Sequence, residues 1–218
     1  MPMKFYAHPF SSYCQKVLVA LYENDIPFEF RLLGGDEQVA AEHAALWPLK
    51  RMPVLVDEGR TVLETSVIVE HLGIHYPGPV RLIPRAADAA LEVRMMDRFF
   101  DNYVMTPMQK IVADRIRAAD HRDAYGVAEA RRSLDIAYRW LNDAMTAREW
   151  AAGGAFSLAD CAAAPALFYA DWAHPIGDAF SNVRAYRQRL LARPSFARAV
   201  NEARPYRPLF PLGAPDRD

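Results

Sequence analysis

The stretch Ser11-Ser12-Tyr13-Cys14-Gln15-Lys16-Val17 joins a strand-like run, Met3-Lys4-Phe5-Tyr6, to an amphipathic helical run. The helical run places Tyr13, Val17, Ala20 and Leu21 on one face. The first turn of a helix carries unpaired backbone N–H groups and a partial positive charge. A hydroxyl or thiol in this turn therefore lies at a site that can bind an anion, such as a thiolate.

The residues that follow extend this junction into a small α/β domain. After Ile26-Pro27, apolar and charged residues alternate through Leu32, which is the period of a half-buried strand. Two later strands flank Asp57-Glu58-Gly59-Arg60, a hairpin signal, and Pro77 ends the last helix. The predicted elements are a strand at 3–6, the helix after Ser11, a strand at 28–32, a helix near 37–45, strands at 54–56 and 61–63, and a helix from about Ser66. Their order is βαβαββα.

A change of composition divides the chain after Pro77-Gly78-Pro79, where the pattern becomes almost purely helical. We predict a first domain at 1–78, a linker at 79–86 that packs on the surface, and an all-helical domain at 87–218 with about five helices.

Two stretches stand out in the helical part. An apolar stripe recurs from Val127 to Met145 at intervals of three and four. Ser157-Leu158-Ala159-Asp160 is typical of a helix start with a capping box, and the apolar run after it predicts a central helix in which Cys161 is an inert core residue. The proline-rich tail from Arg204 is expected to wrap the surface.

Composition excludes several classes of function. The chain has 218 residues, 52% of them hydrophobic and 24% charged, with a net charge of −1. Such a balance gives no electrostatic reason to bind nucleic acid or an anionic membrane. No stretch reaches the roughly 18 uncharged residues of a membrane span, and we expect a cytoplasmic protein. Its two cysteines allow neither a disulfide framework nor a four-ligand zinc site.

The chain resembles a cytosolic glutathione S-transferase over nearly its whole length, in particular the serine-type, theta-like and zeta-like bacterial enzymes. The resemblance rests on the order and spacing of motifs around the βαβαββα unit. These motifs are Ser11 to Val17, Pro48 to Leu55, Glu64-Thr65-Ser66-Val67-Ile68, and Ser157 to Asp160. It implies a thioredoxin-like first domain, a glutathione transferase that acts in detoxification, glutathione as cosubstrate, a small electrophile as second substrate, and a homodimer.

The resemblance also assigns residues that bind glutathione. In thioredoxin-like folds the proline of Met52-Pro53 is cis, and the residue before it offers its backbone to an extended peptide. By the same resemblance Glu64 pairs with the γ-glutamyl ammonium and Thr65 holds the γ-glutamyl carboxylate. Lys50 and Arg51 would then steady the glycyl carboxylate. Glu64-Thr65-Ser66 is equally suited to being only a helix N-cap.

Ser11 is the expected catalytic residue, because it occupies the place of the serine in theta-like and zeta-like transferases and of a cysteine in omega-like or glutaredoxin-like proteins. Lowering a thiol pKa from about 8.5 to below 7 takes roughly 2.7 kcal/mol. A helix N-terminus supplies about 0.3 to 2 kcal/mol and a hydrogen bond to a charged acceptor about 1.5 to 3 kcal/mol. The two together suffice without a general base.

The second substrate is expected between Phe10 and the first long helix of the helical domain, where Tyr103, Met105 and Met108 form an adaptable apolar wall and Trp172 lies nearby. His71 and His75 have a spacing that can bind a metal, but the zincin glutamate is missing, and we predict no metal site.

Two other functions remain open on the sequence. The first is a glutathione-dependent thiol reductase or isomerase that uses Cys14 or Ser12, since Ser11-Ser12-Tyr13-Cys14 is like a Cys-x-x-Cys motif without its first cysteine. The second is a non-catalytic, transferase-like interaction module.

Overall fold

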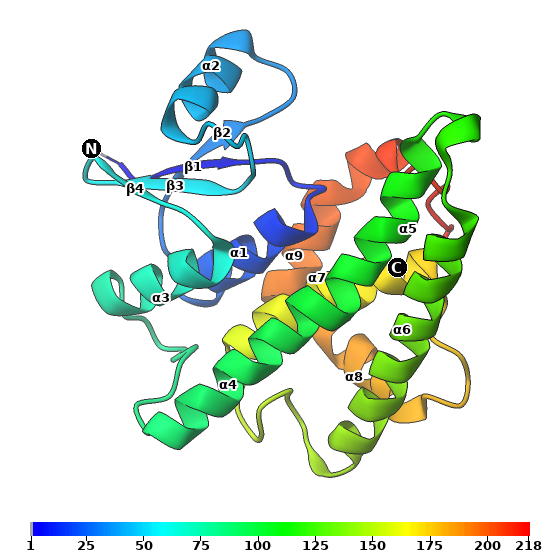
Figure 1. Ribbon diagram of the computed structural model, residues 1–218. Coiled ribbons are helices and arrows are strands. Elements are labelled where there is room, and N and C mark those ends of the chain that lie inside the picture. The colour runs from blue at the N-terminus through cyan, green and yellow to red at the C-terminus, as the bar shows by residue number, and fades with distance from the viewer. Residues whose placement is uncertain (1) are drawn as a thin grey trace.

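The computed structural model describes residues 2–218, and residue 1 of the expected first domain lies outside them. A small α/β part packs against a larger helical part (Figure 1). The elements are β1 (Lys4–Ala7), α1 (Ser12–Glu23), β2 (Glu29–Leu32), α2 (Glu37–Leu46), β3 (Val54–Asp57), β4 (Arg60–Val62), α3 (Thr65–His75), α4 (Ala87–Phe99), the π-helical η1 (Phe100–Met105), α5 (Thr106–Ile116), α6 (Ala124–Ala144), α7 (Leu158–Ala173), α8 (Ser181–Leu191) and α9 (Pro194–Ala203). Short 3₁₀ turns are η2 (Ala119–His121), η3 (Met145–Ala147) and η4 (Arg204–Leu209).

The first part is a four-stranded sheet in the order β2-β1-β3-β4. Strand β1 runs parallel to β2 and antiparallel to β3, and β3 and β4 form the predicted hairpin. Figure 1 shows α2 on one face of the sheet and α1 and α3 on the other. The order βαβαββα is confirmed, and with it the thioredoxin-like domain followed by an all-helical domain.

Helix α1 is more deeply buried than a single apolar face would make it. Every residue from Cys14 to Leu21 is buried, including the polar Gln15 and Lys16. The reason is its position, since α1 contacts α3, α7 and α9 and also lies against one face of the sheet (Figure 1). The helix that carries Ser11 is therefore held by both domains.

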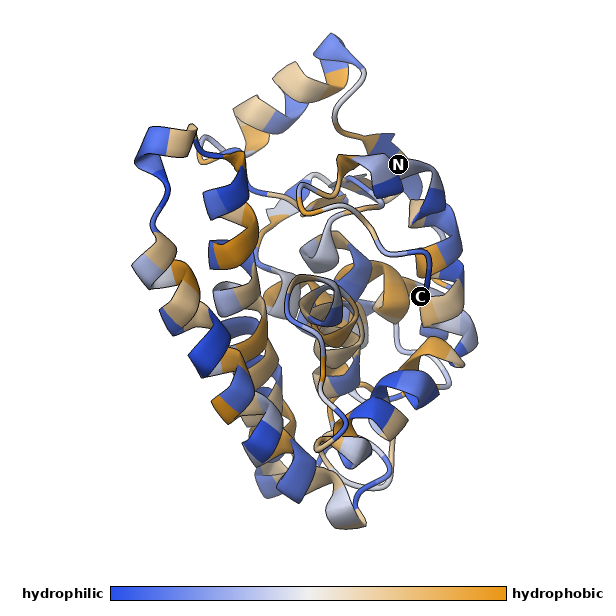
Figure 2. Ribbon diagram, turned by 90° about the vertical axis from the view of Figure 1, so that its right-hand side faces the viewer, coloured by the Kyte–Doolittle hydropathy of each residue, from blue (hydrophilic) through white to orange (hydrophobic). Residues whose placement is uncertain are grey.

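The helical part has more α-helices than the sequence predicts. Six α-helices follow residue 86 within the described chain, where about five were expected. One reason is the π-helical turn η1, which carries the chain from α4 into α5. Another is Pro194, which starts α9 as a separate short helix after α8. Along the peripheral helices, hydrophilic and hydrophobic residues alternate (Figure 2).

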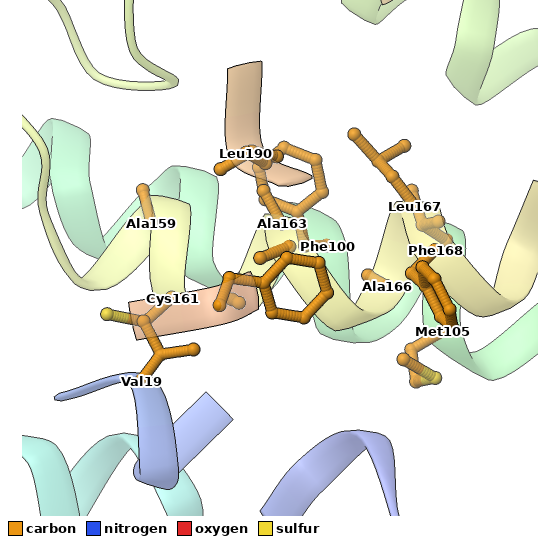
Figure 3. Packing of buried hydrophobic residues seen from close by; sticks show 14 of the residues in the cluster. Val19, Phe100, Met105, Ala159, Cys161, Ala163, Ala166, Leu167, Phe168 and Leu190 are labelled. Atoms are coloured by element: carbon orange, nitrogen blue, oxygen red, sulfur yellow. The ribbon is translucent and has the colours of Figure 1, made fainter. Parts of the chain in front are cut away.

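Helix α7 is the centre of the helical part, as the apolar run predicts. Each of its residues from Leu158 to Ala173 is buried, and the predicted capping box at Ser157 and Asp160 is present. Figure 3 shows Cys161 beside Val19 of α1, and Met105 below Phe168. Cys161 is fully buried among apolar neighbours, which confirms its packing role.

Residues 76–86 connect α3 to α4 and pack against the rest of the protein. Leu82 is buried, and its carbonyl accepts a 2.8 Å hydrogen bond from the backbone N–H of Leu158. The tail after α9 is also attached, because Phe210 is buried against Trp172 and Tyr169. Both segments are therefore packed against α7 of the helical part.

Candidate functional site

Ser11 is the N-cap of α1. Its backbone is extended, with φ −81° and ψ 123°, and its Oγ accepts a hydrogen bond of 3.4 Å from the backbone N–H of Cys14. Its own N–H donates to the carbonyl of His8 at 3.0 Å, which fixes the loop before the helix. Because Oγ acts only as an acceptor in these contacts, its hydrogen remains available to a group in front of the helix.

A crevice of about 610 Å³ opens in front of Ser11, between the α/β part and the helical part. All seven residues expected to bind glutathione line it: Ser11, Lys50, Arg51, Met52, Pro53, Glu64 and Thr65. They come from three separate connections, namely the β1–α1 loop, the segment before β3, and the β4–α3 turn. The fold thus assembles residues that lie more than fifty positions apart in the sequence.

The peptide bond between Met52 and Pro53 is cis, as the resemblance implies. Pro53 is buried directly before β3, whereas Met52 is exposed at the wall of the crevice. Strand β3 is an inner strand, paired with β1 and β4, so the backbone of Met52 is held where this strand begins.

The turn into α3 lines the crevice and leaves the first N–H groups of this helix without a side-chain cap. Glu64 has a left-handed backbone, with φ 66°, and its side chain forms no cap to the helix. Its carboxylate is exposed, while Thr65 is buried. The first turn of α3 therefore has free donors for an anion, with an acidic side chain beside them for a cation.

A buried network of charges supports the crevice from behind. Lys16 Nζ of α1 lies 2.8 Å from Asp101 Oδ2 and donates at 3.1 Å to Ser66 Oγ of α3. Ser66 Oγ in turn donates to Asp97 Oδ2 at 2.7 Å, and Arg98 bridges the two aspartates. Burial raises the pKa of Asp101, and Lys16 opposes that shift. The network ties α1, α3 and α4 together at the site.

Cys14 and Ser12 do not face the crevice. Cys14 is fully buried, and burial raises the pKa of its thiol to about 11, although the hydrogen bond with Ser11 opposes this. Ser12 is also buried, and its hydroxyl donates to the Sδ of Met105 at 3.3 Å. A buried, protonated thiol is a poor nucleophile, so the geometry favours Ser11 over both neighbours.

The expected apolar wall is not assembled at this crevice. Met105 and Met108 are buried in the core, and Tyr103 is exposed beside Phe99. Phe10 and Trp172 pack together with Tyr169, and Trp172 is buried. None of these five residues lines the crevice in front of Ser11.

Six other residues line the crevice that the sequence alone did not indicate: Tyr13, Trp47, Arg98, Asp101, Asn102 and Gln109. The sequence analysis placed Tyr13 on the apolar face of its helix. Its position two residues after Ser11 could have indicated that it lines the crevice. The other four crevice residues of the helical part, from Arg98 to Gln109, lie in or beside the π-helical turn. This turn changes which side of the helix faces the crevice.

His71 contacts the carboxylate of Asp57, and its ring lies against the ring of His75. Nε2 of His71 is 2.8 Å from Asp57 Oδ2, and the two imidazole rings lie 4.3 Å apart. Within residues 2–218 no group of three His, Cys, Asp or Glu side chains is arranged to hold a metal. Over the same range, no helix has the length and apolar character that a bilayer crossing requires.

Comparison with known proteins shows the family. The model of the glutathione S-transferase N-terminal domain matches residues 5–80, and that of the C-terminal domain matches residues 98–194. The chain is 26% identical over 215 residues to a probable maleylacetoacetate isomerase of Vibrio cholerae, covering 94% of this chain and 98% of the relative. It is 26% identical over 191 residues to human glutathione S-transferase theta-1, covering 81% and 75%.

Solved structures agree with this result. A glutathione S-transferase from Methylobacillus flagellatus with GSH bound superposes with a TM-score of 0.81 at 26% identity, covering 90% of this chain and 98% of that one. A second, from Methylobacterium radiotolerans in complex with glutathione sulfonate, has a TM-score of 0.77 at 28% identity, covering 92% and 95%. The chain therefore belongs to the glutathione S-transferase family of enzymes.

Proposed function

We propose that this protein transfers glutathione to an electrophile by holding the glutathione thiolate against Ser11. The observation that carries the proposal is the position of Ser11 Oγ at the N-cap of α1, on the wall of a crevice that also presents the cis-proline segment before β3 and the turn into α3. A sulfur placed there meets both a hydroxyl donor and the positive end of a helix.

The remaining walls suit the rest of the tripeptide. The backbone of Met52 is suited to pair with the cysteinyl unit, as an extended peptide pairs with a strand edge. The free N–H groups at Thr65 suit the γ-glutamyl carboxylate, and the exposed carboxylate of Glu64 suits its ammonium. Lys50 and Arg51 line the crevice beside Met52, where they would meet the glycyl carboxylate. Structural relatives with GSH or glutathione sulfonate bound support the same ligand.

The test is the variant Ser11→Ala. Glutathione should still bind, since its backbone and carboxylate contacts remain. The pKa of bound glutathione, measured by the ultraviolet absorbance of the thiolate, should rise by about one to two units, because a hydrogen bond to a charged acceptor contributes about 1.5 to 3 kcal/mol. Ser133→Ala is the matched control, because Ser133 is exposed on α6 and bonds only to its own helix. Full activity and an unchanged thiolate pKa in Ser11→Ala would contradict the proposal.

A second candidate is glutathione-dependent isomerisation, which the named Vibrio relative favours. A thiolate that adds to a cis double bond can leave again after rotation, so Ser11 would serve in the same role. A reductase or isomerase that uses Cys14 or Ser12 fits less well, because both side chains are buried. Cys14→Ser distinguishes these routes: a Cys14-dependent enzyme loses turnover, and a Ser11-dependent enzyme keeps it. If calorimetry found no binding at millimolar glutathione, the interaction-module hypothesis would remain.

We further propose a homodimer formed through α3 and α4. Each helix exposes two large apolar side chains there, Val67 and Ile74 on α3 and Leu91 and Met95 on α4. The ion pair between Arg94 and Glu70, at 2.8 Å, joins the two helices into one face. An exposed apolar face of this kind is typical of an association surface.

The dimer is tested by the double variant Leu91→Glu with Met95→Glu, which should run as a monomer in light scattering after gel filtration. The double variant Tyr125→Glu with Ile136→Glu is the matched control, because it places the same two charges at exposed apolar positions of α6. A monomeric unsubstituted protein would contradict the proposal.

We also assign the protein to the cytoplasm and to detoxification, since glutathione is its cosubstrate and both cysteines are free thiols.

A further inference from the structure

Strand β2 lies at one edge of the sheet, and within residues 2–218 it pairs with β1 alone. The backbone N–H groups of Glu29 and Leu33 donate to carbonyls at either end of β1, at 2.8 and 2.9 Å. Because a parallel ladder engages alternate residues of an edge strand, the backbone N–H and C=O groups of Phe30 and Leu32 point away from the sheet. These groups are placed to pair with another strand.

An open groove of about 640 Å³ lies beside this edge. Phe28, Phe30 and Leu32 form its wall on the β2 side, and residues of α1 and α9 contribute other walls. Leu32 is 38% exposed, and the two phenylalanines are half-buried. The strand contains neither proline nor lysine, the residues that commonly block an edge. An apolar row therefore accompanies an unblocked strand edge.

The alternate residues of β2 are charged and lie on the face of the sheet that carries α2. Arg31 Nη2 is 2.6 Å from Glu42 Oε2 of α2, and Arg31 Nη1 is 3.2 Å from Glu29 Oε1. The Glu29 side chain is 39% exposed and that of Arg31 is 23% exposed. One charge of each sign is thus accessible beside the edge.

The segment Phe28-Glu29-Phe30-Arg31-Leu32 is complementary to itself when two copies run antiparallel. With Phe30 opposite the same residue of the second copy, each Glu29 lies opposite an Arg31. Each Phe28 then lies opposite a Leu32. The outward backbone groups form the hydrogen-bonded pairs, and the charged residues take the positions between them, where facing side chains lie closer. The neighbouring registers place Glu29 or Arg31 opposite its own copy, and like charges in that position destabilise a pair.

We propose that β2 is a docking edge for a second copy of this chain, in which two β2 strands pair antiparallel about Phe30 and join the two sheets into one. The apolar row of each strand then covers part of the groove of the other. The paired segment, 28–32, is short, so the interface is smaller than the roughly 1,200 Å² of a stable complex and the association is weak. The groove shares no residue with the crevice in front of Ser11, and the docking edge is separate from the face of α3 and α4.

The first test measures mean mass by sedimentation equilibrium over roughly 10 µM to 1 mM, the range of weak contacts of this size. The protein carries Leu91→Glu with Met95→Glu, which removes association through α3 and α4. We expect a monomer at the lowest concentration and a dimer at the highest. Leu32→Lys should abolish this dimer, because it places a charge in the apolar row. Ile116→Lys is the matched control, at a 69% exposed apolar residue of α5, and should keep the dimer.

The second test examines the register by oxidative cross-linking in the same protein at high concentration. Phe30→Cys places two thiols directly opposite each other and should give a covalent dimer. Leu32→Cys is the matched control, because it is more exposed but lies opposite Phe28 and should remain uncross-linked. Cys14 and Cys161 are buried and give no background.

Three outcomes would overturn the proposal. A mass that stays monomeric at the highest concentration would exclude a second copy and leave the edge to an extended segment of another protein. A dimer that survives Leu32→Lys would place the contact elsewhere on the molecule. Cross-linking of Leu32→Cys as readily as of Phe30→Cys would exclude pairing about Phe30.

Discussion

The ammonium of Lys16 lies 2.8 Å from the carboxylate of Asp101, across the boundary between the α/β part and the helical part. Only 1% of the Lys16 side chain is exposed. Asp97 forms a second ion pair with the same ammonium, so one buried cation holds two buried anions. Such a cluster is stable only when every charge keeps its partner.

We predict that Lys16→Met lowers the free energy of unfolding by about 3 to 5 kcal/mol, because within residues 2–218 it leaves two buried carboxylates with Arg98 as the one cation still paired with them. Urea denaturation followed by circular dichroism measures this. The exposed surface pair of Arg184 and Asp178 provides the control, since Arg184→Met should cost at most about 1 kcal/mol. The double variant Lys16→Met with Asp101→Asn should recover part of the loss, and failure to do so would argue against an electrostatic cause.

The thiol of Cys14 should be inert in the folded protein. Burial raises its pKa to about 11, and the side chain is fully enclosed. We expect a disulfide reagent such as DTNB to react with it at pH 7.5 only after unfolding, and Cys14→Ala to keep glutathione-dependent activity. Mass spectrometry of the native protein after incubation with oxidised glutathione gives an independent measurement. A stable mixed disulfide at Cys14 would contradict the prediction.

The sequence was sufficient to predict elements that depend on local signals. The strand–helix junction before Ser12, the hairpin at Asp57 to Arg60 and the capping box at Ser157 each depend on a few neighbouring residues. The cis bond before Pro53 and the grouping of the crevice residues came from the family resemblance, since they depend on motifs far apart in the chain.

The helical wall of the crevice could not be predicted in the same way. Periodicity treats α4, η1 and α5 as regular helices, but the π-helical turn rotates the residues after Phe99 relative to those before it. Met105 and Met108 consequently enter the core, while Asn102 and Gln109 reach the crevice. The burial of the charged Lys16 was likewise invisible, because its partners are about eighty positions away.

The hydrogen bonds of Asp57 should produce a measurable pH dependence of stability. Burial by itself would raise the pKa of this carboxyl, but donation from Tyr76 at 2.6 Å and the contact with His71 outweigh it and hold the pKa below its usual value. Because the pKa is lower in the folded state, the carboxylate stabilises the fold above about pH 4, and this contribution is lost as the pH falls through the folded value.

Tyr76→Phe removes one of these donors and should lower the free energy of unfolding by about 1 kcal/mol at pH 7. The difference from the unsubstituted protein should shrink as the pH is lowered below 4, where Asp57 becomes protonated. Unfolding at a series of pH values measures it, with Tyr125→Phe as control, since Tyr125 is 75% exposed. A difference that is constant from pH 7 to pH 3 would show that Asp57 is not the partner responsible.

The start of α7 depends on Asp160 more than on Ser157. Asp160 is fully buried and accepts hydrogen bonds from the N–H groups of Ala151 and Ser157, at 2.8 and 2.9 Å, and from the hydroxyl of Tyr186 at 2.6 Å. Asp160→Ala would leave those donors buried and unpaired, at about 1 to 3 kcal/mol each. Ser157→Ala removes a cap and the 3.0 Å hydrogen bond that its hydroxyl donates to Asp160, but it leaves the other three donors paired and should cost about 1 kcal/mol.

We therefore expect Asp160→Ala to lower the free energy of unfolding by at least about 3 kcal/mol, because each of the three main donors contributes about 1 kcal/mol or more. Asp160→Asn should fall between Asp160→Ala and Ser157→Ala, because an amide oxygen still accepts from Ala151 or Tyr186 but its NH₂ group opposes the remaining donor. Thermal and urea unfolding of the three variants rank them. If Asp160→Ala were no less stable than Ser157→Ala, the polar contacts around this carboxylate would contribute little, and the helix start would be held by the packing of its apolar neighbours alone.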